Sequence, residues 1–217
     1  MSRVEAAIAQ EGTSMIRTLA AALVALLIES GSAAATSATA FGDSFTAGSG
    51  WYGLLHLGDD NFAKGGAAAN PAFANVPSNT LAKQLQRWRA AGKPTNDWVV
   101  VFIGINDILE ATTTFSISRA AYTKALKELR AAGAKLVLVK APDLGKTPKY
   151  AGTSEGAELT KKTITWNKFI AQQAGAFSAG LVDLFGKLSS SSLYGADGLH
   201  PNGAGQRIIA NAIGAKL

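Results

Sequence analysis

A serine, an asparagine and an aspartate–histidine pair could together form a site for nucleophilic catalysis. Ser44 lies in the stretch "AFGDSFTAGSGWYG", residues 40–53, directly after a short apolar run. His200 lies in "GADGLHPNGAG", with Asp197 three residues before it. A serine hydroxyl is a weak nucleophile at its own pKa and needs a general base, which a carboxylate in turn orients. One turn of local structure can bring this aspartate and histidine to the same side.

Each of these motifs also has a second interpretation. A D-x-x-H pair suits a structural or metal-binding role equally well, although two histidines and no cysteine make no convincing set of metal ligands. His56, in "GLLHLG", is interpreted as a packing or surface residue. Asn106, in "GIND", can donate its amide to an oxyanion, with backbone N–H groups at Ser44 and in "KGG" (64–66) as further donors. It can equally form a turn or a helix cap.

Two further patterns match functional motifs but lack their context. Gly48, Gly50 and Gly53 fit the dinucleotide fingerprint G-x-G-x-x-G, which requires the glycines at a strand-to-helix turn. Gly48 instead lies six residues beyond the apparent end of the strand. "GTSEG", 152–156, fits the nucleophile elbow G-x-S-x-G, but loop-like residues precede Ser154 where the elbow needs a strand. We therefore interpret the glycines as turn residues and Ser154 as a helix N-cap.

Alternating apolar runs and amphipathic segments indicate an α/β domain. Continuous Val- and Leu-rich runs are typical of parallel strands buried on both faces, and amphipathic spacing predicts helices between them. The expected strands are residues 37–42, 97–104, 134–141 and 180–185, with a weaker candidate at 61–63, and the expected helices are 78–92, 116–133, 154–175 and 202–217. This order predicts a parallel sheet of roughly five strands with helices on both faces.

The order of the strands predicts where the chemistry lies. In sheets of this kind, ligands bind in the loops beyond the carboxyl ends of the strands. Counting the weaker candidate as the second strand, Ser44 follows the first strand, Asn106 the third, residues 141–156 the fourth, and Asp197 and His200 the last. Four separate loops are therefore expected to meet at one rim of the sheet.

The N-terminal residues have the composition of an export signal. Residues 19–28 form an unbroken apolar run, with a positive residue before it and an A-x-A site at Ala33–Ala35 after it. We predict a signal peptide over residues 1–38, with Met15 as an alternative start, followed by one domain over 39–217. Such a run is too short to span a membrane. A buried or amphipathic N-terminal helix is the alternative interpretation; otherwise the protein is expected to be secreted or periplasmic.

A net charge of +6 raises the question of a nucleic-acid partner. The basic residues are scattered along helical segments such as 83–93 and 122–130, where they alternate with apolar ones. This spacing is typical of a solvated helix face, so we expect no nucleic-acid partner. The chain has no cysteine and therefore no disulfide.

Taken together, the motifs resemble one family. "GDS" (42–44), a glycine pair after "NFA" (61–63), "GIND" (104–107) and "DGLHP" (197–201) occur in this order at the ends of successive elements. This pattern is similar to that of the SGNH hydrolases, also called the GDSL esterase/lipase family, and extends from about Phe41 to the C-terminus. The resemblance implies a flavodoxin-like three-layer α/β/α sandwich, and we expect neither a cofactor nor a metal.

The resemblance also implies a role for each site residue. Ser44 corresponds to the nucleophile, Asp197 and His200 to the other members of the triad, and Ser44, Gly66 and Asn106 to the donors of the oxyanion hole. The implied function is that of a serine hydrolase that cleaves small-molecule or lipid esters through an acyl-enzyme, and the predicted signal peptide adds the expectation that it is secreted. A polysaccharide O-deacetylase and a non-catalytic binding protein on the same fold are the alternatives.

Large apolar residues near the motifs raise the question of an acyl-binding site. Phe45, Trp51, Tyr52, Ile108 and Leu109 follow positions in the predicted catalytic loops. They could line an apolar pocket, but apolar residues beside strands usually belong to the core.

Overall fold

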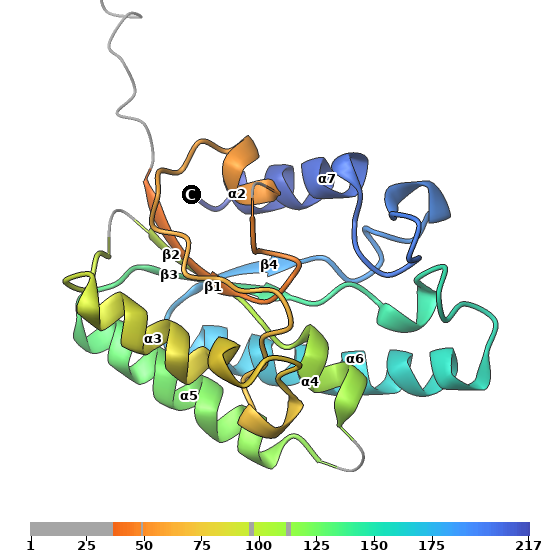
Figure 1. Cartoon of the computed structure of the whole chain (residues 1–217), viewed down its shortest axis with the longest axis horizontal. Helices are drawn as coiled ribbons and strands as arrows, with labels where there is room; N and C mark the ends of the chain where they lie inside the picture. Colours follow the sequence, from red (N-terminus) through yellow and green to blue (C-terminus); the bar gives the residue numbers. More distant parts are fainter. Residues whose placement is uncertain (1–36, 49, 96–97, 112–113) are drawn as a thin grey trace, which may run out of the picture. The chain divides into compact units, whose positions relative to one another are not determined.

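The structure is a computed structural model that describes residues 37–48, 50–95, 98–111 and 114–217 (Figure 1). These ranges belong to one compact unit, Thr36–Leu217. The predicted signal peptide, apart from its last two residues, lies outside the described residues. Within them, no helix is both long enough and apolar enough to cross a membrane.

Four parallel strands form the central sheet, in the order β1-β2-β3-β4. They are β1 (Ala38–Gly42), β2 (Trp98–Phe102), β3 (Leu136–Lys140) and β4 (Gly180–Asp183). One row across the sheet runs from Phe41 through Val101 and Leu138 to Leu181. β1, β2 and β3 are buried along almost all of their length, as their continuous apolar sequences indicate.

Residues 61–63, expected as a further strand, contribute only a single bridge. Asn61 pairs in parallel with Ala40, whose N–H donates to the carbonyl of Asp60 at 3.0 Å and whose carbonyl accepts from the N–H of Phe62 at 2.8 Å. Because β2 occupies one edge of β1, this segment lies along the other edge. Charged residues directly before and after the segment are disfavoured in strands, which accounts for its short pairing.

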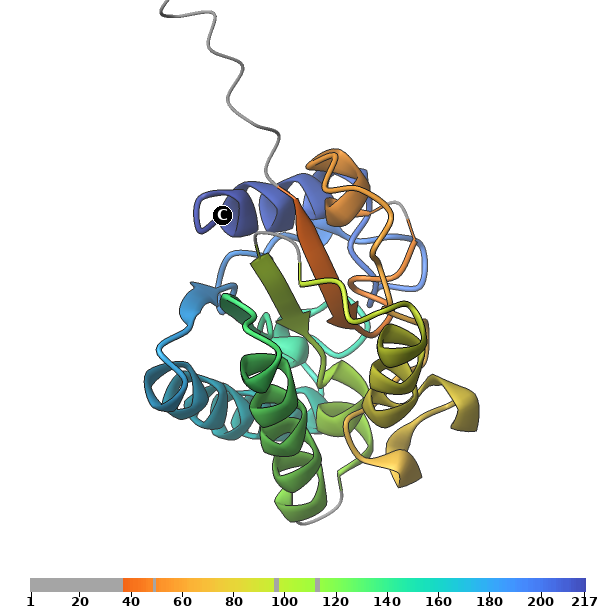
Figure 2. The same cartoon turned by 90° about the vertical axis from the view of Figure 1, so that its left-hand side faces the viewer.

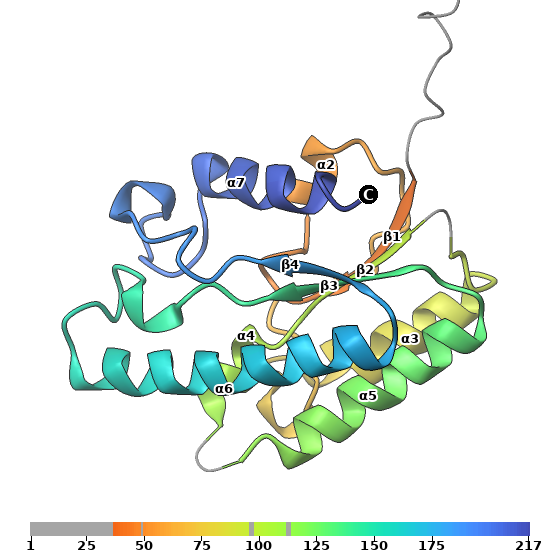
Figure 3. The same cartoon turned by 180° about the vertical axis from the view of Figure 1, so that it is seen from behind.

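Helices cover both faces of the sheet and complete the predicted three-layer α/β/α sandwich. The helices are α2 (Trp51–Leu54), α3 (Leu81–Ala90), α4 (Ile105–Glu110), α5 (Ser116–Ala131), α6 (Ser154–Ala176) and α7 (Gly203–Gly214). α2 and α7 pack together on one face, and α3 to α6 lie on the other (Figures 1 and 3). Seen from the side, the strands lie between α7 and the larger helical layer (Figure 2). The four helices expected from the sequence are confirmed to within a few residues, whereas α2 and α4 were not expected.

The start of α6 differs from the sequence interpretation by one residue. The N-cap is Thr153, whose hydroxyl accepts from the N–H of Gly156 at 2.9 Å. Ser154, predicted to be the cap, is the first residue of the helix instead. The acidic residue Glu155 follows in the first turn, where a negative charge interacts favourably with the helix dipole.

Candidate active site

Ser44, His200 and Asp197 form a continuous chain of hydrogen bonds. Nε2 of His200 lies 2.9 Å from Oγ of Ser44, and Nδ1 of His200 lies 2.5 Å from Oδ2 of Asp197. Ser44 comes from the turn after β1, and the other two residues come from the loop between β4 and α7. In this geometry a histidine can accept the serine proton while the carboxylate orients the imidazole ring.

Asp197 also fixes the backbone that carries the histidine. Its Oδ1 accepts from the N–H of Leu199 at 2.9 Å and from the N–H of His200 at 3.0 Å. The hydrogen bond to the His200 ring, assisted by these two backbone N–H groups, lowers the pKa of Asp197 to about 2. Asp197 is therefore ionised near neutral pH, which suits a residue that stabilises an imidazolium.

The loop that carries Asp197 and His200 is attached to the start of α7. Asn202 caps this helix, with its Oδ1 accepting from the N–H groups of Ala204 and Gly205. Its Nδ2 donates to the carbonyl of Tyr194 at 2.9 Å, on the other side of the loop. The N–H of Gly195 in turn donates to the carbonyl of His200 at 2.8 Å. These bonds hold the loop without any sheet pairing to β4.

A buried glutamine binds the backbone where β1 ends and the turn with Ser44 begins. Oε1 of Gln84, on α3, accepts from the N–H of Gly42 at 3.0 Å, and its Nε2 donates to the carbonyl of Gly42 at 2.7 Å. A Cβ at Gly42 would lie 2.4 Å from the carbonyl oxygen of Phe102. Only glycine therefore fits where β1 ends and the turn begins.

Asp43, the residue before Ser44, ties this turn to the start of α4. Its fully buried carboxylate accepts from the N–H of Phe45 at 3.1 Å through Oδ1, and from the N–H groups of Gly104 and Ile105 at 3.1 and 3.0 Å through Oδ2. Burial raises the pKa of Asp43 to about 7, against the opposing effect of these backbone N–H groups, and the nearby Asp107 raises it further. Asp43 was not among the site residues predicted from the sequence, although its place directly after a buried strand was a usable signal.

The three predicted oxyanion donors lie around one cavity. Nδ2 of Asn106 donates to the carbonyl of Ala67 at 2.8 Å, which leaves the second hydrogen of its amide for another acceptor. Gly66 has a φ of +68°, a conformation that favours glycine. In the part of the chain that the structure describes, the backbone N–H groups of Ser44 and Gly66 donate to no other group. Both are therefore available to a ligand.

A second buried carboxylate, that of Asp107, holds the loop that follows Gly66. Its Oδ2 accepts from the N–H of Ala69 at 2.8 Å, and its Oδ1 accepts from the N–H of Asn70 at 2.9 Å. Burial raises the pKa of Asp107, while the hydrogen bond from Asn70 is the largest opposing effect. Asp107 directly follows Asn106, so it links two of the predicted donors. From the sequence, Asp107 was expected at most in a turn or a helix cap.

The cavity beside Ser44 has a volume of about 410 Å³ and a largely polar lining. It is lined by Ser44, Gly66, Asn75, Ile105, Asn106, Leu109, Glu110, Lys149, Tyr150, Glu155, Leu199 and His200. Of the five apolar residues considered for an acyl site, only Leu109 lines it. Phe45, Trp51, Tyr52 and Ile108 are buried in the core instead.

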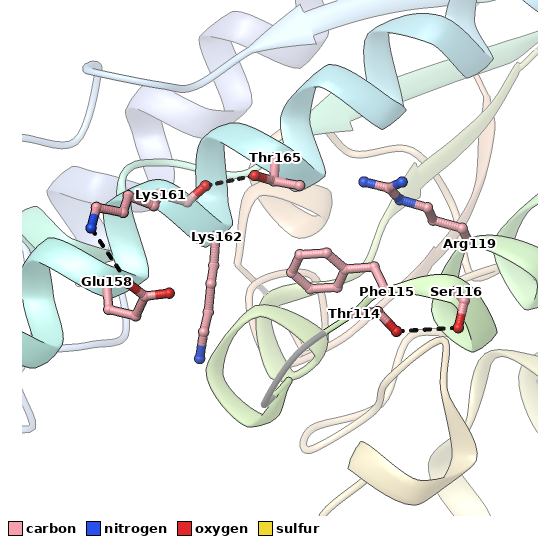
Figure 4. A pocket seen from close by; sticks show the side chains of 8 residues that line it. All are labelled: Thr114, Phe115, Ser116, Arg119, Glu158, Lys161, Lys162 and Thr165. Carbon is pink, nitrogen blue, oxygen red and sulfur yellow. Dashed lines mark hydrogen bonds and ion pairs between the residues drawn. The ribbon is translucent and has the colours of Figure 1, made fainter.

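A second cavity, of about 360 Å³, lies between α5 and α6 (Figure 4). It is lined by Thr114, Phe115, Ser116, Arg119, Glu158, Lys161, Lys162 and Thr165. Glu158 and Lys161, one turn apart on α6, form an exposed ion pair at 3.7 Å. None of the residues predicted to act in catalysis lines this cavity.

The other residues considered from the sequence lie away from the triad or form part of turns and helix ends. His56 is exposed, with a φ of +51°, in the turn after α2. Gly48 occupies a turn with a φ of +78°, Gly50 is the N-cap of α2, and Gly53 lies within that short helix. Among the residues placed by the structure, no three His, Asp or Glu side chains are grouped so that they could hold a metal ion.

Asp43→Asn is expected to change how stability depends on pH. Because the pKa of Asp43 is raised from 3.8 to about 7, the folded protein binds a proton at this position more tightly than the unfolded chain does between those values. The contribution of Asp43 to the free energy of unfolding therefore falls as the pH rises from about 4 to about 7. Chemical denaturation at pH 4 and at pH 8 measures this effect. From pH 4 to pH 8, the free energy of unfolding of the wild type should fall by up to about 4 kcal/mol relative to that of the variant. An equal difference at both pH values would contradict this assignment.

Solved structures of low sequence identity share this fold. A GDSL-like lipase from Bacteroides thetaiotaomicron matches with a TM-score of 0.63 and 17% identity, over 83% of this chain and 87% of that one. A member of the lipolytic protein G-D-S-L family from Veillonella parvula has a TM-score of 0.59 and 17% identity, over 82% and 96% of the two chains. An acetylxylan esterase from Geobacillus stearothermophilus matches with a TM-score of 0.58 and 17% identity, over 83% of this chain and 93% of that one. A comparison with curated protein sequences found no match.

A family model gives the stronger relationship. The model described as the GDSL-like lipase/acylhydrolase family matches residues 40–208, from within β1 to within α7. These residues make up more than half of the chain and include every residue of the site described above. The chain therefore belongs to the GDSL-like lipase/acylhydrolase family.

Proposed function

We propose that this protein hydrolyses carboxylic esters through a Ser–His–Asp triad and an acyl-enzyme. The observation that carries the proposal is the hydrogen-bond chain from Ser44 through His200 to Asp197, which begins in the cavity that Gly66 and Asn106 also line. A nucleophile, its general base and unoccupied N–H donors are the groups that acyl transfer requires in one place.

In the first half of the proposed reaction, Oγ of Ser44 attacks the ester carbonyl carbon and its proton moves to Nε2 of His200. Asp197 stabilises the imidazolium that forms. The negative charge on the former carbonyl oxygen is bound by the backbone N–H groups of Ser44 and Gly66 and by the second amide hydrogen of Asn106. His200 then transfers its proton to the leaving alkoxide, which departs as the alcohol and leaves an acylated Ser44.

In the second half, water takes the place of the alcohol. His200 removes a proton from the water, and the resulting hydroxide attacks the acyl carbon. The same three donors bind the second oxyanion, and the proton on His200 returns to Oγ of Ser44 as the carboxylic acid is released. His200 accepts or donates the proton in every proton transfer of the cycle.

Ser44→Ala and His200→Ala are each expected to lower kcat for p-nitrophenyl acetate by at least about 10³-fold, because each removes a member of the triad. Ser154→Ala and His56→Ala are the matched controls, since neither residue lines the cavity. Both controls should retain wild-type activity within about twofold. Full activity in Ser44→Ala would exclude the proposed mechanism, and loss of activity in Ser154→Ala would point to the G-x-S-x-G motif instead.

The polar lining of the cavity favours esters with a short acyl group and a polar alcohol as substrates. Glu110, Lys149 and Glu155 line it, and none of the large aromatic residues near the motifs does so except Tyr150. A long acyl chain would find little apolar surface to bury here. This observation also favours the second candidate function, removal of acetyl groups from a polysaccharide.

A chain-length series of p-nitrophenyl esters tests this specificity. We expect kcat/KM to be highest for acetate or butyrate and at least about tenfold lower for laurate, because each additional methylene gains little burial in a polar cavity. Release of acetate from acetylated xylan, measured beside this series, tests the deacetylase. A maximum at laurate or longer would contradict the preference for short acyl groups.

We further propose that the protein is exported. The support is the pattern of residues 1–38 alone: a positive residue, a short apolar run and an A-x-A site. N-terminal sequencing of the protein recovered from the medium or periplasm of an expressing bacterium should give a start between residues 34 and 40. An intact N-terminus on protein that stays in the cytoplasm would refute export.

A further inference from the structure

We infer that Asp43 and Asp107 are positioning residues that hold the three oxyanion donors at their correct spacing. The inference rests on the proposed function, since it concerns the donors used in that reaction. Neither side chain lines the cavity, so neither contacts the substrate. Both are fully buried carboxylates. They act through the backbone of the segments that carry Ser44, Gly66 and Asn106.

The donors come from three segments that the sheet alone does not hold together. Ser44 belongs to the turn after β1, Gly66 to the loop between Asn61 and α3, and Asn106 to the start of α4. The loop with Gly66 is joined to β1 by the bridge between Asn61 and Ala40 and by the hydrogen bond from the N–H of Lys64 to the carbonyl of Gly42 at 3.2 Å. These contacts with β1 end at Lys64, so the distance between the loop and the start of α4 is set by other contacts.

Asp43 sets the spacing between the first and third segments. It directly precedes Ser44, and its Oδ2 accepts from the N–H groups of Gly104 and Ile105, the two residues before Asn106. Its Oδ1 accepts from the N–H of Phe45, on the far side of Ser44. One carboxylate thus bonds to the backbone beside the nucleophile and to the backbone beside the amide donor.

Asp107 sets the spacing between the third and second segments. It directly follows Asn106, and its two oxygens accept from the N–H groups of Ala69 and Asn70, a few residues after Gly66. The hydrogen bond from Nδ2 of Asn106 to the carbonyl of Ala67 connects the same two segments at 2.8 Å. Asp43 therefore joins the segment with Ser44 to the segment with Asn106. Asp107 joins the segment with Asn106 to the segment with Gly66.

Hydrogen bonds to a charged acceptor are stronger than those between neutral groups, and a buried N–H that loses its acceptor is costly. An Asp→Asn substitution keeps the size of the side chain but turns one acceptor into an NH₂ group that faces backbone N–H donors. The segments must then move apart. Misplacing a catalytic group by about 1 Å can cost about 10²-fold in rate without weakening ground-state binding equally.

The test measures kcat and KM for p-nitrophenyl acetate at pH 8 in Asp43→Asn and Asp107→Asn. We expect kcat to fall by about 10- to 10²-fold in each variant while KM stays within about threefold. Asp143→Asn is the matched control. Asp143 is also buried beyond a strand and accepts from the N–H of Gly145 at 3.1 Å and from Oγ1 of Thr160 at 2.7 Å, but it touches none of the three donor segments. Its kcat should remain within about twofold of the wild type.

A double mutant separates positioning from a general loss of stability. If Asp107 acts through the oxyanion donors, Asp107→Asn should lower kcat at least threefold less in an Asn106→Ala background than in the wild type, because one donor that it positions is already absent. Equal losses in both backgrounds, or a similar loss of kcat in Asp143→Asn, would overturn the inference. Near-ultraviolet circular dichroism confirms that each variant is folded. Should an Asn variant not fold, Asp107→Ser replaces it, with room for a water to accept from the freed N–H groups.

The outcomes also distinguish this inference from the proposed function. If the wild type hydrolyses the ester and Ser44→Ala does not, while both Asp→Asn variants keep wild-type kcat, only the positioning roles are refuted. If the wild type shows no hydrolysis, or Ser44→Ala is as active as the wild type, the proposed function itself fails.

Discussion

The carboxylate of Asp43, buried between the turn after β1 and the start of α4, is the interaction on which the rest of the site depends. It accepts hydrogen bonds from three backbone N–H groups, one in the turn after β1 and two at the start of α4. This geometry requires β1 and β2 to be neighbours in parallel register, so that Gly42 lies opposite Phe102 and the two loops leave the sheet side by side. The order of the strands thus brings Ser44 and Asn106 together, and the carboxylate holds the two segments at a fixed spacing.

The groups proposed to react and the groups that hold them differ in their surroundings. The side chains of Asp197 and His200 are about half exposed, at 51% and 45%. Asp43, Gln84 and Asp107, which bind the backbone, have no exposed surface. Burial raises the pKa of both carboxylates, the nearby Asp107 raises that of Asp43 further, and the ionised forms therefore lower the stability of the fold. Such a cost is common where an active site must be rigid in advance of the reaction.

The sequence predicts those features that depend on local pattern. Continuous apolar runs predict β2 and β3, because a strand buried on both faces admits few polar residues. The residues predicted for the triad lie within hydrogen-bonding distance of one another because each follows the end of a strand or precedes a helix. Features that depend on distant partners were missed. The role of Asp107 depends on N–H groups 37 and 38 residues away in the chain. Phe45 and Ile108 were considered for a pocket but lie in the core, which spacing along the chain does not reveal.

Covalent labelling tests most directly whether Ser44 is an activated nucleophile, as we propose. The protein is treated with an alkyl fluorophosphonate, and the adduct is measured by intact mass and located by peptide mapping. We expect one phosphonyl group per chain, attached to Ser44, and none on the Ser44→Ala variant. A folded wild-type protein that remains unlabelled, as a non-catalytic binding protein on this fold would, or one labelled at Ser154, would contradict this proposal.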